Sequence, residues 1–310
     1  MSDGVTLGTT LAFGLGAVAL IVYYGWRSRQ RRRIEPMLVL ALAMVPLFWL
    51  EAPGDWAFWA QYNPHFAHVP AWGPLGMTYG GLPLIAIPGY PFYYVPPMVI
   101  AVYVATRLRW PSRFTAAQRL LISGLVVGFI WDVPFEIIAI RLGIWRLADS
   151  PWGLTLWGGS RFQSDIAISI VIAIFCMFCT YLIGRTDDRG DVVLLGWAKR
   201  HTSSSRAAHL LHFAVVAVSF QIIYALSYVP IFVVHYLGLV THQSSGPLFD
   251  DIPLQSTVGM GHGIVGFAIL VGGAALQVWL IFALLNRLDA HLLGKSSPVQ
   301  AESQVGASQA

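Results

Sequence analysis

The sequence predicts an all-α integral membrane protein: a polytopic bundle of about seven transmembrane helices, with the N-terminus outside and the C-terminus in the cytoplasm. Two compositional observations support this class. Hydrophobic residues make up 56% of the 310 residues and charged residues only 11%, and the mean hydropathy is +0.63. The third observation is a series of apolar stretches of about 20 residues, each long enough to cross a hydrocarbon core of roughly 30 Å. These features exclude a soluble domain, in which about 25% of residues are charged.

The apolar stretches predict a single transmembrane domain over residues 1–293. The expected helices are 5–26, 36–57, 88–108, 118–143, 164–184, 207–237 and 259–286. The first has no basic segment before it, so we interpret it as a retained helix rather than a cleaved signal peptide. Residues 294–310 are small and polar and are expected to form a disordered tail.

The positions of the basic residues predict the orientation of the bundle. Sixteen of the 19 Lys and Arg residues fall in the loops after the first, third and fifth helices and at the C-terminal end. Arg141, Arg146 and Arg161 remain on the opposite side. Because Lys and Arg accumulate in cytoplasmic loops, this pattern places the N-terminus outside.

Two loops on the predicted outer side are unusually aromatic. Residues 58–92 contain no Lys or Arg, and residues 144–163 include Trp145, Trp152 and Trp157. Such segments either fold over the bundle as lids or anchor it at the membrane interface. The sequence leaves both interpretations open.

The candidate catalytic residues are carboxylates inside apolar helices. Asp132 and Glu136 lie one helical turn apart, on the same side of their helix. An ionised side chain in the middle of a membrane-spanning helix costs about 2.5–3.5 kcal/mol, so such a pair is a functional hypothesis by default. The second helix repeats the acid-x-Pro-x-acid pattern with Glu51 and Asp55. Counting about 1.5 Å per residue from the cytoplasmic arginines puts both pairs at a similar depth, in the outer half of the bilayer. We therefore expect four carboxyl groups to converge.

Polar residues of other segments fall at the same level and are candidates for substrate binding. Gln221, Tyr224, Tyr228 and His235 form a polar stripe on the sixth helix, and His262 opens the seventh. The outer segments and the fourth helix add Tyr62, Asn63, Trp131 and Trp145. Tyrosines within membrane helices also serve in packing, and an interfacial histidine also occurs without a functional role.

Two buried carboxyl groups on one face repel each other when both are ionised, so one is expected to keep its proton while the other loses it. A protonated and an ionised carboxyl together can perform general acid–base catalysis. Because the histidines are scattered and the two cysteines, Cys176 and Cys179, lie within one apolar helix, we expect neither a metal site nor a cofactor.

The motifs are similar to those of a known family. Asp132-x-x-x-Glu136 is followed by Arg141-Leu142-Gly143-Ile144-Trp145, and upstream stand Glu51-x-x-x-Asp55-Trp56 and Tyr62-Asn63-Pro64. With these motifs the chain resembles the spirocyclase AveC-like membrane proteins of bacteria over about residues 36–286. The resemblance implies a multi-pass protein of the bacterial cell (inner) membrane. It also implies a cyclase or isomerase of secondary metabolism, since named members take part in spiroketal formation on polyketides.

Spiroketal closure needs an acid, a base and an apolar cavity that excludes water. Under this hypothesis Glu136 and Asp132 share the acid–base role, Glu51 and Asp55 support them, and Tyr224, Tyr228 and His262 position the substrate. The expected partners are a hydrophobic small molecule and the lipid bilayer, with no nucleic acid. The oligomeric state stays open.

Three alternatives remain at this point. Pro134 to Glu136 also resembles part of membrane carotenoid and terpenoid cyclases, although Ile137 stands where a lycopene cyclase would have a second glutamate. A proton-coupled transporter or binding protein for a lipophilic solute would use the same carboxylates to relay protons or hold a cation. In a structural protein the acidic pairs would only hold helices together.

Overall fold

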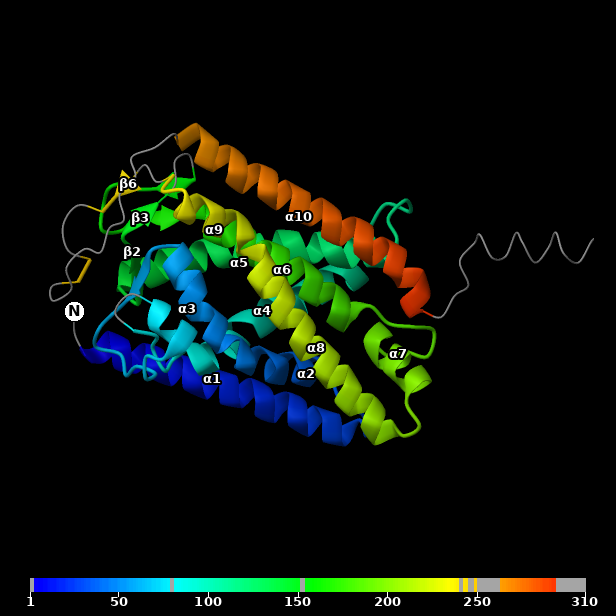
Figure 1. Cartoon of the computed structure of the whole chain (residues 1–310). Coiled ribbons are helices and arrows are strands. Elements are labelled where there is room, and N and C mark those ends of the chain that lie inside the picture. Colours follow the sequence, from blue (N-terminus) through cyan, green and yellow to red (C-terminus); the bar gives the residue numbers. More distant parts are fainter. Residues whose placement is uncertain are drawn as a thin grey trace, which may run out of the picture.

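The computed structural model describes residues 3–78, 81–150, 154–239, 242–244, 248–249 and 263–293. The helices are α1 (Asp3–Gln30), α2 (Pro36–Met44), η1 (Val45–Leu47), α3 (Phe48–Ala57), η2 (Gly73–Met77), α4 (Ala86–Arg107), α5 (Ala116–Leu142), α6 (Ile166–Gly184), α7 (Val193–His201), α8 (Ser205–Ser227), α9 (Val229–Tyr236) and α10 (Gly263–Leu292). The strands are β1 (Ala60–Tyr62), β2 (Trp145–Leu147), β3 (Asp149–Ser150), β4 (Thr155–Leu156), β5 (Ser164–Asp165) and β6 (His242–Gln243). This helical bundle confirms the predicted fold class (Figure 1). The expected disordered tail, residues 294–310, lies outside the described residues.

Six helical segments of the described residues are long and apolar enough to cross a membrane. They are Gly4–Gln30, Pro36–Ala57, Ala116–Leu142, Ile166–Gly184, Ser205–Tyr236 and Ile264–Asp289. The seventh predicted span, 88–108, corresponds to α4, which is helical over Ala86–Arg107 but contains Pro91, Pro96 and Pro97 and is less apolar. Seven spans and the orientation of the termini therefore stay predictions.

Two of the predicted helices are interrupted at prolines. The second changes to a 3₁₀ turn at Val45–Leu47, around Pro46. The sixth divides into α8 and α9 next to Pro230. Pro53 and Pro134 lie inside α3 and α5, which continue through them.

The centre of the bundle is α6. Of its most apolar 18-residue stretch, 89% is buried inside the protein. It packs against α5 at Gly124 and Gly128. A Cβ atom on Gly124 would lie 2.7 Å from both the carbonyl oxygen of Cys176 and the Cα of Met177. Glycine at this position therefore lets the two backbones touch, as small residues four apart do in membrane helix pairs. Cys176 itself is free and buried in this contact.

The aromatic loops form a cap at one end of the bundle. The antiparallel β1–β2 ladder joins the two loops, β4 pairs with β5 across the second loop, and β3 links the second loop to β6 in the segment after α9. Figure 1 shows β2, β3 and β6 together at this end and α7 at the other. Asn63 fixes the cap to the end of α5, since its Nδ2 donates to the carbonyl of Gly143 over 3.1 Å. The loops are thus folded over the bundle end, as in the first of the two interpretations.

The end that carries α7 holds the ion pairs between described residues. Arg31 pairs with Glu35 at 3.0 Å, Arg185 with Asp289 at 2.7 Å, and Lys199 with Asp191 at 2.6 Å. The sequence analysis did not predict α7, because its nine residues lie within a loop assigned by charge.

Asp165 begins α6 and yields a prediction about pH. Its Oδ1 accepts the N–H of Ala167 at 2.8 Å, and burial raises its pKa to about 7. In the unfolded chain an aspartate titrates near pH ~3.9. From about pH 4 to about pH 7 the folded protein therefore holds a proton that the unfolded chain releases, so stability falls as pH rises through this window and is level above it.

Asp165→Asn keeps an oxygen for the Ala167 N–H and removes the titration. We therefore compare the midpoints of thermal unfolding of the variant and the wild type in detergent. The difference, variant minus wild type, should increase as the pH goes from about 5 to about 8. A difference that stays constant over this range would contradict the assignment.

Candidate active site

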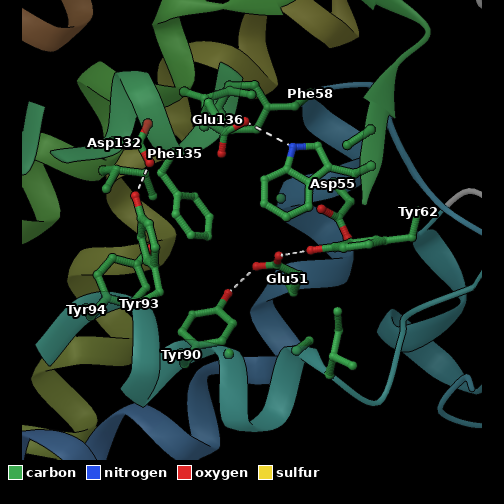
Figure 2. A pocket seen from close by; sticks show the side chains of 18 of the residues that line it. Glu51, Asp55, Phe58, Tyr62, Tyr90, Tyr93, Tyr94, Asp132, Phe135 and Glu136 are labelled. Carbon is green, nitrogen blue, oxygen red and sulfur yellow. Dashed lines mark hydrogen bonds between the residues drawn. The ribbon is translucent and has the colours of Figure 1, made fainter. Parts of the chain in front are cut away.

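One cavity of about 100 Å³ lies beneath the cap. Residues from α1, α3, α4, α5, α6 and the α8–α9 junction line it, together with β1 and β2. Glu51, Asp55, Asp132 and Glu136 all belong to this lining. Figure 2 shows Glu51 and Asp55 on one side and Asp132 and Glu136 on the other. The four carboxyl groups converge as the sequence predicted.

Glu51 accepts hydrogen bonds from three tyrosines. The hydroxyl of Tyr62 donates to Oε1 over 2.6 Å, and those of Tyr90 and Tyr224 donate to Oε2, the latter over 3.4 Å. The hydroxyl of Tyr224 in turn accepts from Tyr228 at 2.6 Å. The hydroxyls of three tyrosines thus converge on the Glu51 carboxyl group.

Asp55 lies one turn beyond Glu51 on α3 and is buried. The hydroxyl of Thr78 donates to its Oδ2 over 3.2 Å. Between the two acids stands Gly54, where a Cβ atom would come within 2.7 Å of the Tyr228 ring. The absence of a side chain at this position lets the Tyr228 ring pack directly against α3.

Asp132 and Glu136 face the cavity from α5 and are 1% and 7% exposed. The Tyr93 hydroxyl donates to Asp132 Oδ1, and Ser169 lies beside the same carboxyl group. Asp132 Oδ2 has no hydrogen-bond partner. The indole Nε1 of Trp145 donates to Glu136 Oε2 over 3.0 Å. This pair therefore has fewer donors than Glu51.

The β1–β2 ladder supplies a donor to each acidic pair. Tyr62 and Trp145 are partners in the register, with ring centroids 5.6 Å apart. Tyr62 donates to Glu51, whereas Trp145 donates to Glu136. Burial, and next the charge of Glu51, raise the pKa of the Tyr62 hydroxyl well above its usual range, so it remains a donor at neutral pH. A single ladder thus orients both sides of the site.

The cavity contains eight of the 13 predicted site residues. They are Glu51, Asp55, Tyr62, Asp132, Glu136, Trp145, Tyr224 and Tyr228. Their roles in catalysis and substrate binding stay predictions.

Four predicted substrate-binding residues lie outside the cavity lining, so the expected polar stripe on the sixth helix is incomplete. Gln221 accepts a hydrogen bond from the half-exposed Trp49 indole at 2.7 Å. His235 lies on α9, where its ring packs between those of Trp56 and Trp59.

The other two predicted residues outside the cavity lining are Asn63 and Trp131. Asn63 holds the cap to α5, and Trp131 is half-buried away from the cavity. His262 lies outside the described residues.

The sequence analysis missed the contribution of α4. Tyr90 and Tyr93 donate to carboxylates of opposite pairs, and Tyr94 completes the same wall. Their spacing of three and four residues places all three hydroxyls on one face of a helix. That pattern was the available signal, but the aromatic residues around it were assigned to an outer loop.

Arg141 is not the counter-ion of Glu136. Its guanidinium lies over the ring of Trp157, 4.6 Å from the centroid, and over that of Phe162 at 4.9 Å. Arg141 therefore contacts the loop after α5 instead of Glu136.

The described lining includes no Lys, Arg or His beside its four carboxyl groups. Within the described residues, no group of three or more His, Cys, Asp or Glu side chains has the arrangement of a metal site. The chemistry that this lining supports is proton transfer between carboxyl groups, with phenol hydroxyls as hydrogen-bond donors.

Comparison with known proteins agrees with the resemblance seen in the motifs. A family profile described as Spirocyclase AveC-like matches residues 29–255. This range begins earlier and ends earlier than the expected 36–286, and it contains every described acid and tyrosine of the cavity. No match was found among curated proteins or among solved structures. Since the profile covers more than half of the chain, the protein belongs to the spirocyclase AveC-like family.

Proposed function

We propose that this protein is a membrane-embedded cyclase that closes a ring on a hydrophobic hydroxyketone by carboxylate acid–base catalysis. Spiroketal formation on a polyketide-like substrate is the reaction that fits best. The proposal rests on one main observation. Two acidic pairs face one apolar cavity from opposite sides, and each pair has its own hydrogen-bond donors. Membership of the spirocyclase AveC-like family supports the same reaction class.

The hydrogen bonds suggest how the roles divide. Glu51, with its phenol donors, suits the base, because those donors stabilise a carboxylate. Glu136 suits the acid, because it shares its face of α5 with Asp132 and two adjacent charges there would repel. Compared with the roles expected from the sequence, this proposal moves the base to α3 and leaves the acid on α5.

The reaction then balances as follows. One hydroxyl of a dihydroxyketone adds to the carbonyl carbon and gives a hemiketal. Glu136 protonates the hemiketal hydroxyl, which leaves as water and forms an oxocarbenium ion. The second hydroxyl attacks that carbon and gives its proton to Glu51. The net change is the loss of one water, and proton exchange between the acids restores the starting state.

The proposal places the protein in the inner membrane of a bacterium with seven spans and its cap on the outer side. The positive-inside pattern supports this orientation. So does the position of α7 and its basic neighbours at the end opposite the cap (Figure 1). The cavity would then lie in the outer half of the bilayer, where a lipophilic substrate concentrates.

The test of the function is stereoselective ring closure. Purified protein in lipid nanodiscs would be incubated with lipophilic dihydroxyketones of graded tether length, and products separated by chiral gas chromatography. We expect one spiroketal stereoisomer in excess and a rate above background. A product mixture identical to that of empty nanodiscs for every tether would count against the proposal, and uptake into liposomes without conversion would favour a transporter.

Tyr90 gives a prediction within this function. Tyr90→Phe removes a donor from Glu51 and leaves the ring, so kcat should fall about 10-fold, since a hydrogen bond to a charged group is worth about 1.5–3 kcal/mol. The matched control is Tyr94→Phe, on the same helix and cavity wall, whose hydroxyl makes no hydrogen bond to a carboxylate among the described residues. Equal kcat values for the two variants would show that the Tyr90 hydroxyl is not needed.

A further inference from the structure

We propose that the cavity binds small organic cations, of the quaternary ammonium or protonated amine class, in preference to neutral molecules of the same shape. This site uses the lining of the proposed active site, but it does not depend on the cyclisation reaction. The inference rests on the charge balance, the aromatic walls and the unused hydrogen-bonding capacity of the cavity.

The charge of the lining is uncompensated. Four carboxyl groups share the cavity, and the described lining residues include no basic side chain. The ion pairs between described residues engage Glu35, Asp191 and Asp289 instead. The arginines nearest in sequence to Glu136 are also engaged: Arg141 and Arg146 lie over aromatic rings of the cap. A mobile cation is therefore the natural partner for any ionised carboxylate in this space.

The walls suit a cation that carries apolar groups. Tyr90, Tyr93, Tyr94 and Tyr224 form a continuous cluster, in which Tyr93 and Tyr94 have ring centroids 4.7 Å apart and Tyr90 and Tyr224 5.7 Å apart. Phe135 extends it, 4.4 Å from the Tyr93 ring. Aromatic faces attract quaternary ammonium groups, and aromatic cages are the usual site for them. An inorganic cation would use this surface poorly.

Acceptor capacity remains on the α5 side. Asp132 is 1% exposed, lines the cavity and has one carboxyl oxygen, Oδ2, without a hydrogen-bond partner. A buried polar atom without a partner is costly, and a bound cation would reduce this cost. The cavity of about 100 Å³ has room for a head group of a few heavy atoms. The size, like the charge, fits an ammonium head.

The experiment compares choline with its neutral isostere 3,3-dimethylbutan-1-ol on the full chain in detergent. Isothermal titration calorimetry gives the two affinities at neutral pH. We expect choline to bind at least about 10-fold more tightly, from the attraction of close opposite charges in a poorly solvated space. Glu51→Gln and Asp132→Asn should each weaken choline binding about 10-fold, because these are the two carboxyl groups that remain ionised when Glu136 holds its proton. Asp191→Asn, which removes a carboxylate from the loop before α7, should leave it unchanged.

Each outcome decides the proposal. Equal affinity for choline and the alcohol in the wild type would overturn it, and this comparison needs no variant to fold. Choline binding that persists undiminished in both the Glu51 and the Asp132 variants would also overturn it, because the cation would then bind elsewhere. Ring closure without choline binding would remove this inference and leave the proposed function intact. Choline binding without ring closure on any substrate would support this inference and remove the proposed function.

Discussion

Glu136→Gln is expected to lower the rate of ring closure by about 10²–10⁴-fold, the usual contribution of a general acid. Glutamine keeps the shape of the side chain and an oxygen for the Trp145 indole, so the hydrogen bond seen in the structure can persist. It has no acidic proton to give to the leaving hydroxyl. The measurement is single-turnover conversion of a dihydroxyketone by wild type and variant in nanodiscs, quantified by chiral gas chromatography.

The control for this substitution is Asp191→Asn, which removes an equal charge at the α7 end of the bundle. It should convert substrate at the wild-type rate. The companion variant is Asp132→Asn, which changes the other acid on the same face of α5. If both the Glu136 and Asp132 variants retained full activity, the α5 pair would have no part in proton transfer.

Gly124→Ala is expected to destabilise the bundle by about 1–3 kcal/mol, as overpacking of a tight core does. The added methyl group would lie 2.7 Å from two backbone atoms of α6 and 2.8 Å from Thr180 Oγ1, and backbone atoms cannot move aside as side chains do. The helices α5 and α6 must then separate. The measurement is the apparent midpoint of thermal unfolding in detergent, which should fall by several degrees.

The matched control is Gly272→Ala on α10. No atom lies within 4 Å of the Cβ that this substitution adds. In an exposed helical position alanine is favoured over glycine by about 1 kcal/mol, so this variant should be as stable as the wild type or more so. A Gly124 variant that is no less stable than the Gly272 variant would show that α5 and α6 have room to adjust.

The parts of the fold that follow from apolar length were predictable. Six of the expected spans correspond to long apolar helices, because about 20 apolar residues have few alternatives to a spanning helix. The convergence of both acidic pairs also followed from the sequence, since carboxyl groups at equal depth on two helices of one bundle avoid lipid by facing its interior.

Other parts depend on tertiary contacts that periodicity does not encode. The pairing of Tyr62 with Trp145 joins loops about 80 positions apart, and nothing local specifies their register. The expected stripe assumed one continuous helix, whereas α8 ends at Ser227 and His235 lies on α9. Gln221 precedes that break, and its hydrogen bond with Trp49 is a tertiary contact that residue spacing does not specify. The helix at 88–108 was predicted, but the sequence does not show that its tyrosines face the acids of α3 and α5, because that depends on how the helices pack.

The β1–β2 ladder supplies a hydrogen-bond donor to each half of the site, so the two halves depend on the position of the same element. Tyr62 and Trp145 stand opposite each other in one short ladder, and each holds a carboxylate of a different helix. A motion that lifts this ladder from the bundle removes a donor from Glu51 and from Glu136 in the same event. The hydrogen bonding of the two acidic pairs therefore depends on one short structural element, and a displacement of the ladder would change both pairs together.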